Sequence, residues 1–444
     1  MACIFINSDM KSYLLITGAN GFVGKNAVSY FLEKDYRIRA LVRKNNNAFG
    51  RHPNLDVFQG DIKDYSSLLN ATYGIDFVIH LAAAKSDESD SYEVNVLGTE
   101  NLIKACRVNG VKCVVNISTI SAKIKHKGLY AKTKDKAEQV VANGGVPFVT
   151  LRPSIIYGDT ENGILGTLVR FSRLPLVPVI GSGEQVFAPI HVKDVVKAIE
   201  MAFSRLELWG TVYDVGGPDK ITFNELINKI GTTINGKKRV RKIHIPVFVG
   251  YIVAKLLKVM LKKPPITVSN VLGSSQEADV QTKNFFRDFG FIPMGLNAGL
   301  NLVLRNCKAE LPEKEARIML GYICQNIGVN RYPTKYEKYY LKALSYYKMP
   351  TFEFGHPIFT HSWLLGPVDA VSRVFYKDSF IQRKLLIATA LIECSTSSAT
   401  ALLSVRISPG NFTYRFLLYG AKGVLKFLFG LVVPSGLIKK YAGQ

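Results

Sequence analysis

The sequence predicts an α/β fold, a doubly wound parallel sheet, because strand-like and helix-like patterns alternate through its first third. The clearest observation is residues 13–24, which read YLLITGANGFVG, an apolar run that ends in a glycine-rich turn. A helical pattern with one apolar face follows at once over residues 25–33. Gly18 permits a tight turn, Gly21 lets an anion approach the backbone, and Gly24 lets the helix pack closely on the strand. We therefore expect a strand, a phosphate-binding loop and a helix.

Further runs have the apolar character of strands, and they lie at residues 37–42, 55–60, 77–84 and 113–117. The run at 77–84 is apolar almost throughout, which is typical of a parallel strand covered on both faces. His80 lies within this run and is interpreted as a packed core residue rather than a catalyst. A helical pattern begins at Glu93, before the last of these strands. Strands that alternate with helices in this way predict a parallel sheet.

The length of the chain predicts more than one domain. At 444 residues, of which 48% are hydrophobic, the chain exceeds what one ordinary core accommodates. We expect a first domain at 1–310, with an integrated small lobe at about 160–190 and 220–310, and a helical, basic second domain at 311–444. The six cysteines show neither a C-x-x-C pair nor metal-ligand spacing, and no secretory signal precedes the first strand. The sequence therefore predicts a reduced, cytoplasmic protein with no metal site.

The net charge of +23 is concentrated in the second half of the chain. Residues 1–234 hold 27 Lys and Arg against 23 Asp and Glu, a net of +4, whereas residues 235–444 hold 30 against 11, a net of +19. Apolar stretches at 243–261 and 414–441 carry interspersed cations, which suits the boundary of an anionic membrane. We expect an anionic membrane surface as partner and no nucleic acid, because nucleic acid gives no reason for the apolar stretches. A lobe helix that covers a substrate pocket explains residues 243–261 equally well.

Two other segments of the second half allow more than one interpretation. Residues 332–347 contain six tyrosines among lysines, which fits a membrane-interface face, base stacking or an ordinary core. Residues 385–405 form a 21-residue stretch without Lys or Arg, long enough to cross a bilayer. Glu393 and eight Ser, Thr or Cys residues within this stretch favour a buried helix instead.

The end of the second predicted strand carries two cations, Arg43 and Lys44, where an acidic residue would hold the ribose hydroxyls of NAD. A guanidinium or ammonium group there suits the 2′-phosphate of NADP. We therefore expect NADP as the cofactor, with NAD as the alternative if both cations are merely exposed loop residues. Asp61, which Ile62 follows after the third strand, could accept a hydrogen bond from the adenine amino group.

Tyr130 and Lys134 stand four residues apart at the start of a predicted helix, so both lie on one helical face. The ammonium group can then sit near the phenolate and lower its pKa. The strand before this helix ends at Ser118 and Thr119, and a hydroxyl there could hold a substrate oxygen. Such a set moves a proton while a nicotinamide moves a hydride.

Nine motifs follow one another along residues 11–300: TGANGFVG, GDI, HLAA, NVxGT, ST, YxxxK, RPSxxYG, HVxDV and YDVGGP. This ordered set resembles the extended short-chain dehydrogenase/reductase superfamily, which has a Rossmann fold. The resemblance implies that Tyr130 is the general acid/base, that Lys134 is its activator and ribose ligand, and that Thr119, or Ser118 beside it, polarises the substrate. It implies cofactor contacts by these residues: Gly18, Asn20, Gly21, Phe22, Val23, Gly24, Arg43, Lys44, Asp61, Ile62, Leu81, Ala82, Ala83, Asn95, Ser118, Tyr130, Lys134, Pro153 and Ile156.

The sequence departs from the superfamily's sugar-nucleotide epimerases in one loop. Thr119 and Tyr130 are only 11 positions apart, whereas those epimerases usually have a much longer connection. The short loop also holds four basic or titratable residues, Lys123, Lys125, His126 and Lys127. Short spacing of this kind resembles an atypical branch that includes the nucleotide-binding accessory subunit of respiratory complex I.

The resemblance therefore implies three functions. The first is an NADP-dependent oxidoreductase that acts on a carbonyl or secondary alcohol of a hydrophobic or sugar-like substrate, at the cytoplasmic face of a membrane. The second is a non-catalytic NAD(P)H-binding subunit of a membrane complex, and the third is a nucleotide-sugar epimerase or dehydratase. The Tyr130 and Lys134 pair argues against the second, and the short loop argues against the third. A homodimer and a membrane-complex subunit are both compatible with the sequence.

Overall fold

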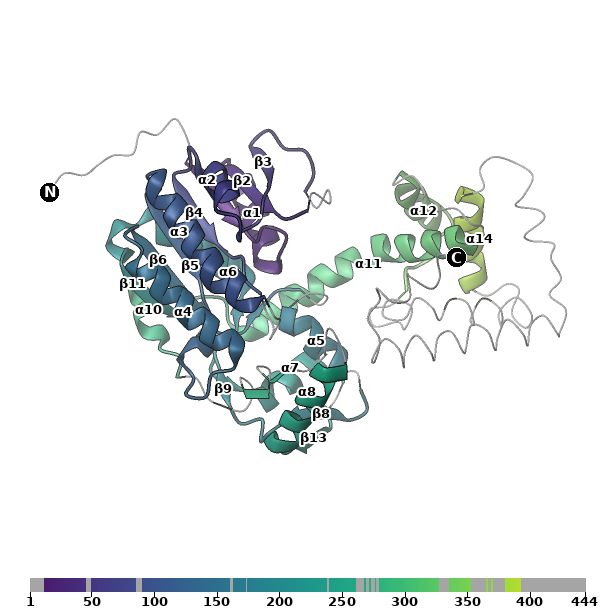
Figure 1. The fold of residues 1–444 in the computed structure, drawn as a ribbon. Coiled ribbons are helices and arrows are strands. Elements are labelled where there is room, and N and C mark those ends of the chain that lie inside the picture. Colours follow the sequence, from purple (N-terminus) through teal and green to yellow (C-terminus); the bar gives the residue numbers. More distant parts are fainter. Residues whose placement is uncertain are drawn as a thin grey trace. The chain divides into compact units, whose positions relative to one another are not determined.

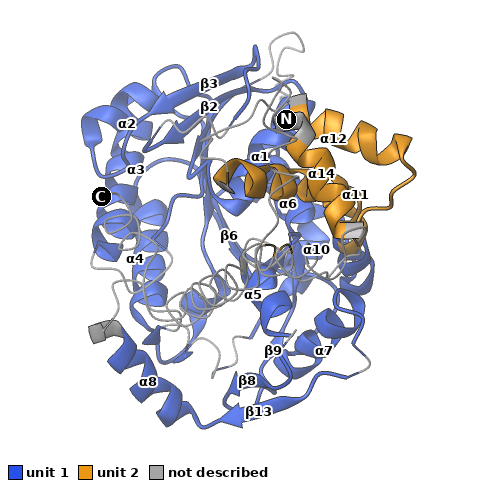
Figure 2. Ribbon diagram, turned by 90° about the vertical axis from the view of Figure 1, so that its right-hand side faces the viewer, with its two compact units in different colours: residues 1–260, 264–303 blue, residues 261–263, 304–444 orange. Residues whose placement is uncertain are grey.

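The structure is a computed structural model, and it divides the chain into two compact units. Unit 1 comprises Met1–Met260 and Pro264–Val303, and unit 2 comprises Leu261–Lys263 and Leu304–Gln444 (Figure 2). The structure describes residues 12–44, 49–84, 90–159, 163–172, 174–237, 239–260, 267–268, 271–272, 276, 279–326, 335–352, 365, 369 and 380–392.

Unit 1 is built on a seven-stranded sheet with the strand order β11-β6-β5-β4-β1-β2-β3, in which all neighbouring strands are parallel (Figure 1). The strands are β1 (Tyr13–Thr17), β2 (Arg37–Val42), β3 (Leu55–Gln59), β4 (Phe77–His80), β5 (Cys113–Ile117), β6 (Phe148–Pro153) and β11 (Thr211–Val215). The order reverses between β1 and β4, where the carboxyl ends of the strands open a crevice for a ligand. The predicted doubly wound parallel sheet is thus confirmed.

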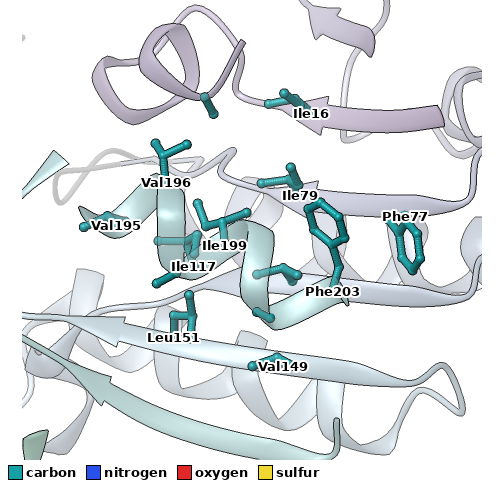
Figure 3. Packing of buried hydrophobic residues seen from close by; sticks show 14 of the residues in the cluster. Ile16, Phe77, Ile79, Ile117, Val149, Leu151, Val195, Val196, Ile199 and Phe203 are labelled. Carbon is teal, nitrogen blue, oxygen red and sulfur yellow. The ribbon is translucent and has the colours of Figure 1, made fainter. Parts of the chain in front are cut away.

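Helices cover both faces of the sheet. One face is covered by α1 (Phe22–Glu33), α6 (Val192–Ser204) and α10 (Thr282–Phe289), and the other by α2 (Tyr65–Thr72), α3 (Gly98–Val108) and α4 (Leu129–Asn143). Figure 3 shows α6 on the sheet, with Ile199 and Phe203 directed at the strands. The ring of Phe203 stacks on that of Phe77 with centroids 5.0 Å apart. Burial on both faces explains why the central strands are apolar throughout.

A small lobe extends unit 1 beyond the carboxyl ends of the strands. It contains α5 (Gly163–Phe171), α7 (Phe223–Thr233), α8 (Val247–Met260) and the strands β8 (Val177–Ile180), β9 (Val186–Phe187), β12 (Ile221–Thr222) and β13 (Lys242–Ile245). Two short strands, β7 (Ile156–Tyr157) and β10 (Ile190–His191), pair between the sheet and this lobe. A capping box begins α7, in which Thr222 and Glu225 each accept a hydrogen bond from the other's backbone N–H.

The described part of unit 2 is helical and packs around α11 (Leu296–Asn326), which begins in unit 1, with α12 (Lys335–Tyr346) and α14 (Phe380–Ile392). Helix α11 is continuous although it contains Pro312. The residues after the proline that enter the core of unit 2 recur every three or four positions, and this packing holds the segment helical: Ala316, Met319, Leu320 and Ile323.

Unit 2 also contains a buried ion pair. Lys384 Nζ lies 2.5 Å from Glu315 Oε1, and both side chains have no exposed surface. The Tyr340 hydroxyl and the Phe352 backbone N–H donate to the same carboxylate at 3.2 and 2.7 Å. Tyr340 is therefore a core residue, whereas Tyr346 and Tyr347 are 80% and 62% exposed, so the core interpretation holds for part of the tyrosine-rich segment only.

No helix among the described residues is long and apolar enough to cross a membrane. The candidate span at 385–405 is described only as far as Ile392, where α14 ends. The basic and apolar stretch at 414–441 lies outside the described residues.

Candidate active site

The glycine loop after β1 lies against the end of β4. Gly18 has a positive φ of 68°, and a Cβ there would lie 2.7 Å from the Ala82 backbone nitrogen. A Cβ on Gly24 would lie 2.3 Å from the Gly18 carbonyl oxygen, so the first turn of α1 packs directly on the loop. The first turn of α1 has no acidic residue. Its N-terminal N–H groups and positive dipole end can therefore receive an anionic group such as a pyrophosphate.

Side-chain hydrogen bonds hold the glycine loop after β1 against the segment that follows β4. The Thr17 hydroxyl oxygen accepts from the backbone N–H groups of Leu81 and Ala82, both at 3.2 Å. The same oxygen lies 2.9 Å from Nδ1 of His80, whose Nε2 lies 3.0 Å from the Thr99 hydroxyl. Burial, with a smaller contribution from Lys134, lowers the pKa of His80 to about 3. His80 is therefore a neutral core residue that holds the crevice together, as interpreted from the sequence.

The other residues implied to bind the cofactor are arranged around the same crevice. Arg43 and Lys44 follow β2 with exposed side chains. Asp61, after β3, accepts at its Oδ1 from the Lys63 backbone N–H at 3.0 Å. Asn20, Gly21, Phe22 and Val23 lie between β1 and the first turn of α1, Ile62 is buried after β3, Ala83 follows β4, Pro153 ends β6 and Ile156 begins β7.

Tyr130 and Lys134 lie one turn apart on α4, and Lys134 is almost completely buried. Its Nζ donates to the Ile117 carbonyl oxygen at 2.8 Å, which brings α4 to the end of β5. Burial lowers the pKa of Lys134 to about 8, whereas the charge of Glu138 acts in the opposite direction. The sequence predicts that Lys134 lowers the pKa of Tyr130, but burial raises that pKa to about 12. The prediction is wrong in direction, because desolvation of the phenolate dominates.

The two candidate hydroxyls at the end of β5 differ in their surroundings. The Ser118 hydroxyl is buried and has no hydrogen-bond partner within the described part of the chain. The Thr119 hydroxyl accepts from the Ser121 backbone N–H at 3.3 Å and caps the 3-10 helix Ile120–Lys123. A buried hydroxyl without a partner is rare, and a substrate oxygen would satisfy it. Among the described residues, the Ser118 hydroxyl thus has unused hydrogen-bonding capacity, whereas the Thr119 hydroxyl serves as a cap.

Asn95 lies in a π-helix, Glu93–Leu97, a local irregularity that often marks functional sites. Its side chain exchanges two hydrogen bonds with the backbone of Ala84, at 2.7 and 3.1 Å, and donates to the Thr133 hydroxyl at 3.0 Å. Thr133 in turn donates to the Tyr130 carbonyl oxygen at 3.0 Å. Asn95 thus joins the loop after β4 to the turn of α4 that carries Tyr130.

A series of charged side chains continues from Lys134. The sequence motifs do not predict it. Glu138, one turn further along α4, forms a two-pronged ion pair with Arg152, whose Nε lies 3.0 Å from each carboxylate oxygen. Asp214 lies 4.0 Å from Arg152 and 2.6 Å from Lys123 Nζ. The side chains of Glu138 and Asp214 are each 7% exposed, so water screens these ion pairs little.

The short loop before Tyr130 is held by hydrogen bonds and an ion pair with residues that do not belong to the candidate site. The Lys123 amine donates to the Asp279 carbonyl oxygen at 2.8 Å, and the His126 backbone exchanges two hydrogen bonds with the Gln276 side chain, at 2.9 and 3.0 Å. Lys127 pairs with Asp135 at 2.5 Å. Three of the four unusual residues of the loop therefore have structural partners. Lys125 is exposed.

Residues 14–216 match the model of the NAD dependent epimerase/dehydratase family. These residues belong to that family. The resemblance to the extended short-chain dehydrogenase/reductase superfamily is thereby confirmed, and the chain carries an NAD(P)-dependent enzyme domain. The matched residues run from β1 to just beyond β11, so they contain the whole sheet of the epimerase/dehydratase domain.

Two relatives of this epimerase/dehydratase domain are oxidoreductases by name. The chain is 25% identical over 319 residues to a 2-alkyl-3-oxoalkanoate reductase of Stenotrophomonas maltophilia (strain K279a), with 63% of this chain and 94% of the relative covered. It is 28% identical over 244 residues to a ceramide reductase of Caulobacter vibrioides (strain NA1000 / CB15N), with 54% and 76% covered. A solved dTDP-glucose 4,6-dehydratase from Bacillus anthracis str. Ames in complex with NAD shares the fold, with a TM-score of 0.53, 20% identity and coverage of 66% and 96%.

Proposed function

We propose that this protein is an NADP-preferring oxidoreductase that reduces a carbonyl, or oxidises a secondary alcohol, on a hydrophobic, lipid-like substrate. The observation that carries the proposal is the hydrogen bond from Lys134 to the Ile117 carbonyl oxygen. It brings the turn of α4 that begins with Tyr130 next to the end of β5, which is followed by Ser118, whose hydroxyl has no hydrogen-bond partner among the described residues. The nicotinamide cofactor would supply or accept the hydride, and the loop at Gly18 would hold its pyrophosphate.

The chemical roles follow from the surroundings of each group. Ser118 donates a hydrogen bond to the substrate oxygen and orients the reacting carbon. Tyr130, whose pKa is raised to about 12, is protonated at neutral pH and donates a proton to that oxygen as it gains negative charge. Lys134 places a positive charge beside the end of β5 and hydrogen-bonds the cofactor's ribose.

The lipid-like character of the substrate is supported by the two relatives, whose names refer to alkylated oxoalkanoates and ceramide. The short connection before Tyr130 supports it as well, because the segment is held to Asp214, Asp279 and Gln276 rather than extended over a large polar ligand. The net charge of +19 over residues 235–444 supports peripheral attachment to an anionic membrane, where such a substrate resides.

A second candidate function is epimerisation or dehydration of a sugar carried on a lipid. One relative, 25% identical over 263 residues, is the N-acetyl-alpha-D-glucosaminyl-diphospho-ditrans,octacis-undecaprenol 4-epimerase of Escherichia coli O157:H7. The same Tyr130, Lys134 and Ser118 set would serve this chemistry. The cofactor would then be regenerated in each turnover instead of being consumed.

The test measures NADPH and NADH consumption by the full-length protein with medium-chain 3-oxo lipids, a 3-oxosphingoid base and UDP-glucose. We expect NADPH to be consumed with at least one lipid and with no nucleotide sugar. The Tyr130→Phe variant should lose activity by at least about 100-fold and still bind NADPH, since a general acid contributes about 10²- to 10⁴-fold. A wild-type protein that binds NADPH and consumes none with any lipid, or a Tyr130→Phe variant that stays fully active, would contradict the proposal.

A further inference from the structure

Helix α8 of the small lobe presents an apolar ridge to solvent. Phe248, Ile252 and Leu256 recur every fourth residue, so their side chains follow one another along a single face. They are 67%, 52% and 59% exposed. Val253 beside them is 39% exposed. Apolar residues that are exposed singly are common, but a contiguous row of large ones indicates a surface that another body covers.

The packing of α8 explains why this face points outward. The inward face has small residues, and Ala254 is completely buried. At Gly250 a Cβ would lie 3.2 Å from Cγ2 of Ile180 in β8, so only a small residue allows the helix to sit this close to the strand. The helix therefore sits close to β8 through its small residues, whereas Phe248, Ile252 and Leu256 remain exposed.

A basic hollow of about 850 Å³ lies in the same lobe. Its lining residues are Leu176, Asn224, Asn228, Lys237, Arg239, Val240, Arg241, Lys242 and His244. Four of these carry a positive charge and none is acidic. Glu184, which accepts a hydrogen bond from Asn224 at 2.6 Å, is the nearby acid that partly offsets the charge at Lys242. The hollow therefore favours anionic groups.

Strand β13 pairs in parallel with β8 in a two-stranded ribbon, contributes Lys242 and His244 to the hollow, and is followed in the chain by α8. Lys242 and His244 alternate with Ile243 along this strand, so the basic side chains point to one face and Ile243 to the other. Ile243 is 48% exposed. Figure 2 shows β13 at the lower edge of unit 1, with α8 and α7 on its two sides. The exposed edge of the lobe at β13 therefore carries cations on one face of the strand and an apolar side chain on the other.

We propose that the β13 edge, with the α8 ridge and the basic hollow on its two sides, is the surface through which the protein docks on an anionic phospholipid bilayer. The proposal rests on the peripheral membrane attachment proposed above, and it adds which surface makes the contact. The cations of the hollow would bind lipid phosphates, and the ridge would enter the boundary between headgroups and acyl chains. A nucleic acid would use the cations, but it would leave the ridge in water.

Cosedimentation with vesicles tests this surface in the full-length protein. The vesicles are pure phosphatidylcholine, or phosphatidylcholine with about one quarter phosphatidylserine. The triple variant Phe248→Gln, Ile252→Gln, Leu256→Gln removes the ridge, and the double variant Arg239→Gln, Arg241→Gln removes two cations of the hollow. All five side chains border the docking surface, and none belongs to the site at Tyr130.

Matched controls remove similar groups elsewhere in unit 1. Leu206→Gln with Ile292→Gln replaces apolar side chains that are 64% and 71% exposed. Lys104→Gln with Lys283→Gln replaces two exposed lysines, on α3 and α10. We expect the controls to bind like the wild type. The ridge and hollow variants should each bind serine-containing vesicles about tenfold or more weakly, since each cation near such a surface contributes about 1 kcal/mol.

A positive signal comes from Phe248→Trp, whose fluorescence should shift to the blue with serine-containing vesicles and be quenched by brominated acyl chains. Ile292→Trp should show neither effect. Wild-type binding that both surface variants retain would overturn the proposed surface and leave membrane attachment standing. Absence of wild-type binding to any vesicle would overturn attachment itself, while activity on soluble 3-oxo lipids would remain a separate result. A hollow variant that loses only binding to single-stranded DNA would show that the partner is a nucleic acid.

Discussion

The Lys134 amine donates to the main-chain carbonyl oxygen of Ile117 at 2.8 Å, although the two residues belong to different elements, α4 and β5. This hydrogen bond favours the protonated amine, whereas burial favours the neutral one, and the pKa of Lys134 is lowered to about 8. The only nearby acidic side chain that acts on it is Glu138, within the described residues. The charge of Lys134 near neutral pH therefore depends on burial, which opposes it, and on Glu138, which supports it.

Replacement of the Glu138 carboxylate should change the pH dependence of the reaction. In the wild type, we expect the rate of reduction to fall as pH rises through about 8, because Lys134 loses its proton there. Glu138→Gln removes the charge that raises the pKa of Lys134, and Arg152 keeps only its longer ion pair with Asp214, so this fall should move to lower pH. The measurement is kcat/KM for reduction against pH. Glu207→Gln, at an exposed position, serves as the control, and an unchanged profile in Glu138→Gln would refute the link.

The cations after β2 predict a preference between cofactors. If Arg43 or Lys44 binds a 2′-phosphate, NADPH should bind more tightly than NADH by about 1 to 3 kcal/mol, the range for a charge-assisted hydrogen bond. Arg43→Asp should reverse the preference, because a carboxylate repels the phosphate and can accept from the ribose hydroxyls. Calorimetric titration with both nucleotides measures this. Equal affinities in the wild type would mean that the two cations are only surface residues.

The two hydroxyls after β5 should respond differently to removal. Ser118→Ala deletes the buried hydroxyl that has no partner among the described residues, so we expect a large loss of kcat with little loss of stability. Thr119→Val deletes the cap that accepts from Ser121, which should cost about 1 kcal/mol of unfolding free energy and leave more of the activity. Steady-state kinetics and urea unfolding of both variants give the comparison. The reverse pattern would assign the substrate contact to Thr119.

The buried imidazole of His80 makes stability depend on pH. Its pKa is lowered to about 3 in the folded protein, from an unfolded value near 6.5, so between these values the unfolded chain binds the extra proton. Stability from this group is present above about pH 6.5 and is lost as pH falls, by up to about 1.4 kcal/mol per pH unit. His80→Gln should make the unfolding free energy of unit 1, measured by urea unfolding, depend less on pH between about pH 4 and 6.5. This range lies between the two pKa values. His52→Gln, at an exposed position, should not have this effect.

The sequence predicts the parts of the fold and the site that depend on short patterns of neighbouring residues. Strands β2 and β5 have the predicted bounds, because an alternating or fully apolar run between polar turns defines its own ends. The glycine loop and the spacing of Tyr130 and Lys134 are likewise local. Each depends on residues within one turn of one another, so no knowledge of distant contacts is needed.

The parts that the sequence does not predict depend on contacts between distant residues. Asp214 is 91 positions from Lys123, and no periodicity links the two. The pKa of Tyr130 is set by how much protein surrounds the ring, which a motif does not contain. Thr133 gives no signal of its own, although its position one residue before Lys134 places it in the same helical turn. The π-helix at Asn95 likewise follows from tertiary packing rather than from helix propensity.

The buried pair of Glu315 and Lys384 has a consequence for how unit 2 is made. The two residues are 69 positions apart, and a ribosome adds about 5 to 20 residues per second, so Glu315 is added to the chain roughly 3 to 14 s before Lys384. During that interval the carboxylate cannot be buried without a large desolvation penalty. The core around α11 therefore closes only after α14 has emerged. A nascent chain that stops short of Lys384 would present an open, apolar helix surface to chaperones and proteases.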